Sequence, residues 1–256
     1  MVVPMTKLNG MTILITRPEG QSASLIERLQ KQGATPISFP TMTIETVPTE
    51  PTHYQQQPYD WIVFTSANAV RQCFSQLTDY AAFLSEASLV AVGPATANAL
   101  RDYTSAPVII PEVEYSSAGL LALPEFADLT GQQCLVVTGV GGKGLLAEVL
   151  PKRGASLTQL ICYRRLCPTV APTALLEYWQ QHGIDVIVTT SSEGLANLYT
   201  ILGDTGKELL ENTSLLVISK AMVAKAKQLG YKRCPIVAKN ASDDCVIDTL
   251  CKEFHP

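Results

Sequence analysis

The chain has 256 residues, of which 46% are hydrophobic and 16% charged, as in ordinary globular proteins. No apolar run approaches the roughly 20 residues that span a bilayer, and residues 1–7 lack the apolar core of a signal peptide. A net charge of −4 argues against a general nucleic-acid surface. We therefore expect a cytoplasmic protein whose partner is a small molecule, not a nucleic acid or a membrane.

Metal and cofactor chemistry find little support in the residue pattern. The seven cysteines form no C-x-x-C pair, and none of the three histidines has another ligand at motif spacing. We interpret the cysteines as reduced structural thiols. The sequence predicts no metal site, no histidine-based triad and no cofactor.

Short apolar runs alternate with amphipathic segments along the chain, which predicts parallel sheets with crossover helices. The expected strands lie at residues 12–16, 35–39, 61–64, 89–92, 108–110, 133–137, 157–163, 186–189, 215–218 and 235–238. The expected helices between them include residues 20–32, 67–77, 95–103, 143–152, 193–201 and 221–229.

Two proline-containing segments, residues 40–58 and 164–172, interrupt this alternation, and we interpret them as exposed chain crossings between two domains. Paired crossings mean that one domain is inserted into the other. We predict a discontinuous first α/β domain of residues 1–39 plus 171–256, an inserted second α/β domain of residues 45–163, and linkers at residues 40–44 and 164–170. Two consecutive domains divided near Gly131 are the simpler alternative.

An internal repeat supports two similar halves. The motif D-x-I-V-x-T-S occurs at residues 60–66 and again at residues 185–191. Ligands of open parallel sheets bind beyond the carboxyl ends of the strands. We therefore expect the repeated Thr-Ser tips to face a cleft between the domains, and the domains to close around a ligand.

The expected strand ends are chemically alike, since nearly all offer a hydroxyl or a glycine just before a helix. Free backbone N–H groups and the helix dipole favour carboxylate or phosphate there. At any one tip, a hydroxyl that only caps its helix is the alternative. The residues that we predict to bind substrate are Arg17, Thr65, Ser66, Ala67, Gly93, Pro94, Thr96, Thr138, Gly139, Gly141, Lys143, Thr190, Ser191, Ser219 and Lys220.

A glycine run allows a rival interpretation. Gly139, Gly141 and Gly144 match G-x-G-x-x-G between a strand and a helix, the context of a dinucleotide-binding loop. The acidic residue about 20 positions later is missing, but Arg164 and Arg165 leave an NADP-binding enzyme open. A Walker loop is excluded because Gly144 stands where Ser or Thr is needed. A tight turn for close helix packing is the other alternative.

Tyr163 is the candidate catalytic residue, because it ends an expected strand beside the second crossing. Its hydroxyl would act there as a weak acid or a hydrogen-bond donor; a packed interdomain tyrosine is the alternative. No carboxylate pair stands out in the sequence. Many donors and few strong acids suit the orientation of an already reactive substrate.

The ordered motifs resemble uroporphyrinogen-III synthases of the bacterial type, from residue 13 to about residue 250. They lie at residues 13–18, 62–70, 90–97, 139–143, 162–165, 188–191, 216–219 and 238–242. The resemblance implies two flavodoxin-like domains with parallel sheets, joined by a two-stranded β linker. It also implies a monomer that uses no cofactor or metal.

The resemblance implies a cyclising lyase. Its substrate would be hydroxymethylbilane, a linear tetrapyrrole with eight carboxylates, which loses water and closes with ring D inverted to give uroporphyrinogen III. Because the substrate closes unaided to the other isomer, catalysis would be mainly orientation. A two-domain module that binds an anionic ligand without turnover is the alternative.

By analogy, Tyr163 would assist departure of the substrate hydroxyl. Five tip residues and the adjacent backbone amides would hold carboxylates: Thr65, Ser66, Thr96, Ser191 and Ser219. Lys143 and Arg17 would add positive charge. Bacterial members usually carry Arg-Gly where this chain has Thr138 and Gly139, and often Arg-Glu where it has Lys143 and Gly144. Which tip holds which carboxylate therefore stays open.

Overall fold

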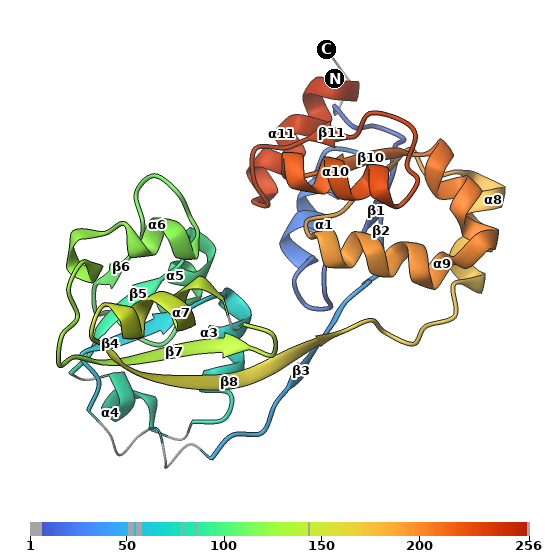
Figure 1. Cartoon of the computed structure of the whole chain (residues 1–256). Helices are drawn as coiled ribbons and strands as arrows, with labels where there is room; N and C mark the ends of the chain where they lie inside the picture. The colour runs from blue at the N-terminus through green and yellow to red at the C-terminus, as the bar shows by residue number, and fades with distance from the viewer. Residues whose placement is uncertain are drawn as a thin grey trace. The chain divides into compact units, whose positions relative to one another are not determined.

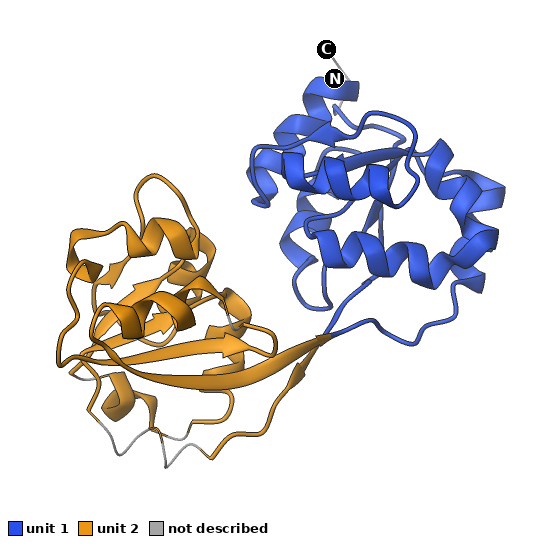
Figure 2. Ribbon diagram, in the orientation of Figure 1, with its two compact units in different colours: residues 1–43, 166–256 blue, residues 44–165 orange. Residues whose placement is uncertain are grey.

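The computed structural model describes residues 7–50, 54, 58–77, 79–84, 86–142 and 144–254. The chain divides into two compact units, which Figure 2 colours separately. Unit 1 comprises Met1–Thr43 and Leu166–Pro256, and unit 2 comprises Ile44–Arg165. The middle of the chain is thus inserted into a unit built from both of its ends.

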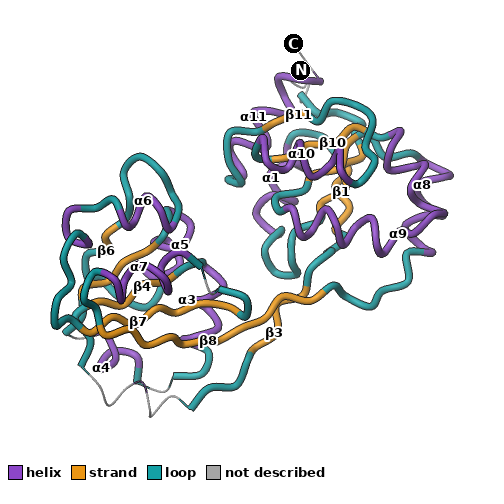
Figure 3. Tube along the Cα trace, viewed as in Figure 1, coloured by secondary structure: helices purple, strands orange, loops and turns teal. Residues whose placement is uncertain are grey.

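Unit 1 contains a five-stranded sheet with the order β11-β10-β9-β1-β2, in which every neighbouring pair is parallel. The strands are β1 (Thr12–Ile15), β2 (Thr35–Ser38), β9 (Val186–Val188), β10 (Ser214–Val217) and β11 (Ile236–Val237). Helices cover both faces (Figures 1 and 3), which is why the central strands are continuous apolar runs.

Alternate residues of β1 enter the two cores of unit 1. Ile13 and Ile15 pack with α1 (Ala23–Lys31) and α11 (Asp243–Phe254). Leu14 packs in the opposite core, to which the other three helices contribute: α8 (Thr173–His182), α9 (Ser192–Asn212) and α10 (Lys220–Gln228). Helix α9 is kinked at Gly203, whose φ of 57° lies in the left-handed region that glycine tolerates.

Unit 2 contains a six-stranded sheet with the order β3-β8-β7-β4-β5-β6. The strands are β3 (Thr43–Thr46), β4 (Trp61–Phe64), β5 (Ser88–Ala91), β6 (Val108–Ile109), β7 (Gln133–Gly139) and β8 (Ser156–Leu166). One face is covered by α3 (Ala67–Phe74), α4 (Tyr80–Leu84) and α5 (Pro94–Leu100). The other face is covered by α6 (Ser117–Leu121), η1 (Pro124–Phe126) and α7 (Leu145–Lys152). The predicted parallel α/β class is confirmed.

The first crossing differs from the sequence prediction. Residues 40–58 are predicted as an exposed connection, but Thr41 and Met42 are buried and β3 joins the edge of the sheet beside β8. The pattern was missed because the edge strand T-I-E-T is only half-buried and lies between prolines. Strand β8 also continues through residues 164–166 of the predicted second linker. The chain therefore passes between the units along two neighbouring strands.

The repeated motif makes the same contacts in each unit. Its first residue ties down the start of a neighbouring strand, since Asp60 accepts from the Gln133 N–H and Asp185 from the Thr12 N–H, both at 2.7 Å. Its last residue caps the following helix, α3 in unit 2 and α9 in unit 1. The repeat therefore encodes one strand-to-helix unit used twice.

Truncation of Leu135 to alanine is expected to destabilise unit 2 by about 3 kcal/mol, because this β7 side chain is fully buried and its loss leaves a cavity. Urea unfolding can be followed by Trp61 fluorescence in a Trp179→Phe background, where Trp61 is the only remaining tryptophan. The control Val140→Ala removes an apolar side chain that is 60% exposed. Equal unfolding midpoints for the two variants would contradict the prediction.

Candidate active site

The carboxyl ends of neighbouring strands in unit 2 bring the predicted residues of that unit to one sheet edge. Ser66 follows β4, Gly93 follows β5, and Gly139 is the last residue of β7. Gly139 pairs with Tyr163 of the adjacent strand β8. This is the edge at which parallel sheets bind ligands.

Tyr163 is held by polar contacts at its hydroxyl. The side chain is 3% exposed, and its oxygen lies 3.0 Å from Ser66 Oγ. Arg165 Nη2 donates a hydrogen bond to the same oxygen at 3.2 Å. Residues two apart on a strand share a face, which explains why Arg165 reaches Tyr163. The spacing of these two residues is the available sequence signal, but the sequence pattern assigns Arg165 no role beside Tyr163.

The missing side chain of Gly139 makes room for the ring. A Cβ atom there would lie 2.6 Å from Cζ of Tyr163, closer than real carbon atoms approach. Gly142 is needed in a similar way, because its Cβ would lie 2.1 Å from Thr138 Oγ1. The strand pairing also shifts register between Thr138 and Gly139. These two glycines therefore serve close packing, as the tight-turn alternative expects.

The three serines among the predicted substrate-binding residues use the same local device after parallel strands. The Oγ atoms of Ser66, Ser191 and Ser219 accept hydrogen bonds from the backbone N–H three residues later, at 3.0, 2.9 and 3.3 Å. Each serine thereby caps its helix, as expected for this residue type. A hydroxyl that accepts one such bond still carries a hydrogen to donate. Capping and ligand binding are therefore compatible at these positions.

Several predicted threonines are directed into the protein instead. Thr96 and Thr138 are buried, and Thr65 Oγ1 lies 3.1 Å from both Val137 O and Thr138 Oγ1. Pro94 is the first residue of α5 and has no N–H to offer. Lys143 lies outside the described residues. The remaining tip residues are at least partly exposed: Ala67, Gly93, Gly141, Thr190 and Lys220.

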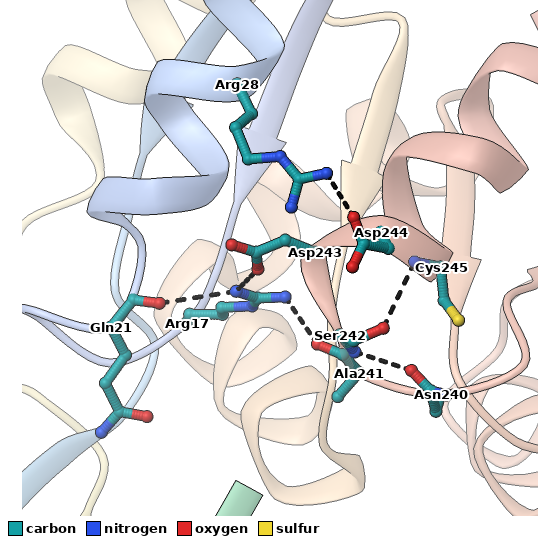
Figure 4. A network of polar contacts seen from close by, with 9 residues as sticks. All are labelled: Arg17, Gln21, Arg28, Asn240, Ala241, Ser242, Asp243, Asp244 and Cys245. Atoms are coloured by element: carbon teal, nitrogen blue, oxygen red, sulfur yellow. Dashed lines mark hydrogen bonds and ion pairs between the residues drawn. The ribbon is translucent and has the colours of Figure 1, made fainter. Parts of the chain in front are cut away.

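The corresponding edge of unit 1 contains the ion-pair network drawn in Figure 4. Arg17 follows β1, and its guanidinium donates to Asp243 Oδ1 at 2.6 Å and to the Ala241 carbonyl at 2.7 Å. The two paired side chains are 11% and 19% exposed. Beside them, Arg28 of α1 pairs with Asp244 at 2.5 Å. Arg17, predicted to add charge for the substrate, therefore has its own charge neutralised by α11.

The Asp243 carboxyl is held in its charged form. Burial alone would raise its pKa, but hydrogen bonds from Arg17 and Ser24 and the charges of Arg17 and Arg28 outweigh burial. The pKa of Asp243 consequently lies below its ordinary value of 3.8. The pair thus stabilises the fold at neutral pH, tying the end of β1 to the start of α11.

Thr41 and Asn197 were missed by the sequence analysis at this same edge. Thr41 is fully buried, and its Oγ1 donates to the Thr16 carbonyl at 3.2 Å. Asn197 of α9 donates to the Thr41 carbonyl at 2.8 Å. These bonds fasten the chain that precedes β3 to the first turns of α9, and only the tertiary structure reveals them.

Three of the seven cysteines, Cys73, Cys134 and Cys162, are buried, as structural thiols are. All seven are free, and burial raises the pKa of Cys162 to about 12 and, together with Asp60, that of Cys134 to about 11. Among the described residues, no group of three or more His, Cys, Asp or Glu side chains is placed to hold a metal ion. Within that same part of the chain, no helix is both long and apolar enough to span a membrane.

Fold and site together define a class of protein. It is a two-unit α/β protein in which each unit presents hydroxyl-capped helix N-termini at the carboxyl edge of a parallel sheet. Unit 2 adds a tyrosine hydroxyl bonded by an arginine. Such edges suit a ligand that carries anionic groups.

Comparison with known proteins identifies the family. The family model described as uroporphyrinogen-III synthase HemD matches residues 23–247. The uroporphyrinogen-III synthase of Salmonella typhimurium is 30% identical over 246 residues, covering 94% of this chain and 100% of the relative. That of Escherichia coli is 29% identical over 255 residues, with the same coverage. The chain belongs to the uroporphyrinogen-III synthase family.

Solved structures support the fold. A mutant uroporphyrinogen III synthase from Thermus thermophilus aligns with a TM-score of 0.59 at 18% identity, covering 95% of this chain and 100% of that one. The Helicobacter pylori uroporphyrinogen-III synthetase aligns with a TM-score of 0.61 at 15% identity, covering 95% and 99%. The family and fold predicted from the ordered motifs are confirmed, and the comparisons support the synthase hypothesis over the NADP-binding and binding-module alternatives.

The Arg17–Asp243 pair predicts a pH-dependent stability. The folded-state pKa of Asp243 is lowered, so its stabilisation is present above about pH 3.8 and is lost as pH falls through the lower folded-state pKa. Asp243→Asn is expected to cost about 2 kcal/mol near pH 7, as for other charged hydrogen bonds. Urea unfolding from pH 7 down to about pH 2.5 measures the free energy of unfolding of both proteins. The difference between the variant and the wild type should shrink as the pH falls below about 3.8.

Asp244→Asn is the matched control, since Asp244 is the next residue but its side chain is 77% exposed. It should cost less than Asp243→Asn at neutral pH. Equal losses in the two variants, or a difference for Asp243→Asn that is constant with pH, would contradict the assignment.

Gly139→Ala is expected to displace the Tyr163 ring and to destabilise the protein by about 1–3 kcal/mol, because the added Cβ would overlap the ring. Carbon-13 NMR shifts of the Tyr163 ring and urea unfolding measure the two effects. In the control Gly141→Ala the new Cβ meets no atom within 4 Å, and only the strain of a φ of +82° remains. Unchanged Tyr163 shifts in Gly139→Ala would show that the close approach is wrong.

Proposed function

We propose that this chain converts hydroxymethylbilane into uroporphyrinogen III with loss of water. The family match over residues 23–247 supports the reaction. The observation that carries the assignment to a site is the Tyr163 hydroxyl, bonded by Arg165 and Ser66 at the carboxyl edge of the unit 2 sheet. We propose in addition a monomer in the cytoplasm that uses no cofactor, as the family resemblance implies.

Tyr163 acts as the general acid in this proposal. Its proton passes to the oxygen of the substrate's hydroxymethyl group, and the C–O bond breaks with its electron pair leaving as water. The substituted carbon of ring D then attacks the remaining azafulvenium cation, and the spiro intermediate fragments and recloses with that ring inverted. The proton lost from carbon in the final closure returns to the Tyr163 oxygen, so no other reactant is consumed.

The serine-capped tips hold the substrate carboxylates. Ser191 and Ser219 each retain a hydroxyl hydrogen to donate, whereas the Ser66 hydroxyl faces Tyr163. The first N–H groups of α3, α9 and α10 lack helical acceptors. Backbone donors and the helix dipole favour a carboxylate at these positions. We retain Lys143 in this proposal as a further carboxylate ligand, but not Thr65 and Thr96, which are directed into the protein.

Orientation supplies most of the catalysis in this proposal. The substrate closes without an enzyme, so the protein has to favour one closure over another rather than create a reactive group. A ~100-fold preference for isomer III requires a difference of only about 2.7 kcal/mol between the two barriers. Several hydrogen-bonded carboxylates that fix the conformation of the chain suffice for a difference of that size.

A coupled assay tests the proposal. Hydroxymethylbilane is generated in situ from porphobilinogen by its synthase, this protein is added, and the oxidised uroporphyrin isomers are separated by chromatography. We expect a dominant isomer III peak that scales with protein concentration. Isomer I alone, at the rate measured without this protein, would refute the proposed function and favour a binding module.

Tyr163→Phe is expected to lower kcat for isomer III by about 100-fold, the lower end of what a positioned acid contributes, because the substrate also ionises unaided. Folding should persist, since phenylalanine fills the space over Gly139 equally well. The same assay gives kcat, and thermal unfolding checks the fold. Wild-type kcat in this variant would remove Tyr163 from the mechanism without affecting the family assignment.

A further inference from the structure

The Tyr163 oxygen has a charged neighbour that general acid catalysis alone does not require. Arg165 Nη2 donates to it at 3.2 Å, and the guanidinium carbon lies 5.7 Å from the centre of the tyrosine ring. Ser66 Oγ lies 3.0 Å from the same oxygen. A buried phenol that only packed between strands would gain little from a cation at its oxygen.

The hydrogen-bonding capacity of these groups allows Arg165 and Ser66 both to donate to the phenol oxygen. Arginine can only donate, whereas a phenol oxygen carries one hydrogen and can accept two further bonds. Ser66 Oγ already accepts from the Ala69 N–H, so its own hydrogen is available for Tyr163. With Arg165 and Ser66 both donating, the phenolic hydrogen is left for the substrate. The same two donors remain in place once that hydrogen has been transferred.

We propose that Arg165 is a positioning residue that acts through Tyr163, by stabilising the negative charge that develops on the phenol oxygen as its proton leaves. This inference rests on the proposed function. During proton transfer the phenolic O–H bond breaks, the proton moves to the substrate hydroxyl, and the electron pair stays on the tyrosine oxygen. Preorganised donors aimed at a developing charge are an effective form of catalysis. When the proton lost in ring closure returns, the charge disappears.

The neighbouring residue Arg164 provides a natural control. Successive side chains of a strand point to opposite faces, and Arg164 pairs with Glu45 at 2.6 Å. It has the same charge and lies one residue away on β8, but its guanidinium bonds Glu45 of β3, and it has no part in the proposed machinery. If catalysis depended only on the positive charge of this strand, substitution of either arginine would lower kcat. If it depends on support of the phenol, only substitution of Arg165 lowers kcat.

The first experiment compares Arg165→Gln, Arg165→Lys and Arg164→Gln in the coupled assay. Arg165→Gln is expected to lower kcat by about 30-fold with KM changed by less than about 2-fold, as for loss of a charged hydrogen bond in the transition state. Arg165→Lys should recover part of kcat, and Arg164→Gln should stay within about 2-fold of the wild type. Thermal unfolding confirms that the variants are folded.

The second experiment repeats the substitution in a Tyr163→Phe background, where no phenolate can form. Arg165→Gln should then cause no further loss, because residues that act as one unit are non-additive. Losses that multiply would show that Arg165 acts independently of Tyr163, for example by binding a substrate carboxylate, and would overturn the inference. An Arg165→Gln enzyme with wild-type kcat would overturn it equally.

These outcomes separate the inference from the proposed function. A wild-type chain that forms only isomer I would overturn the proposed function and the inference together. A wild-type chain that forms isomer III, with Arg165 variants that contradict the expected pattern, would overturn the inference alone. Should Arg165→Gln fail to fold, kcat of Arg165→Lys tests the inference instead. Lysine keeps the positive charge of arginine but not its planar fork of donors.

Discussion

The close approach of the Tyr163 ring to the backbone of Gly139 is the constraint on which the candidate site depends. A Cβ at residue 139 would lie 2.6 Å from the ring, so only glycine lets Tyr163 lie there. With the ring in this position its hydroxyl reaches Ser66, which also caps α3. The strand pairing, the helix start and the phenol are thus connected through one glycine. Gly139, the first glycine of the run that resembles a nucleotide loop, therefore has a packing explanation.

In both units one short motif stabilises the fold and supplies groups that we propose bind the substrate. Its aspartate ties two strands together at their amino ends, and its serine caps a helix at the carboxyl end of the strand. Capping uses the serine oxygen as an acceptor and leaves its hydrogen to donate. A ligand can therefore use these positions without disrupting the helix, which explains how a polycarboxylate could be held by ordinary capping residues.

Charge at a strand end did not by itself indicate a ligand contact. Arg17 and Arg165 both lie near the carboxyl ends of strands, but Arg17 is paired with Asp243, whereas Arg165 donates to a tyrosine hydroxyl. The first pair ties the start of α11 to the sheet, and the second contact places a cation at the oxygen that we propose donates a proton. Their different roles follow from their neighbours, because the side chains themselves are identical.

The sequence by itself determined the alternating α/β pattern, most strands and the serine caps, since periodicity and capping act over a few residues. It also indicated Tyr163 and the family, through the order of short motifs. Only the tertiary structure decided which residues meet: Tyr163 with Ser66 across 97 residues, and Arg17 with Asp243 across 226. The bounds and the partner of edge strand β3 were likewise recognisable only in the folded sheet. Such contacts depend on strand order and register, which local residue patterns do not specify.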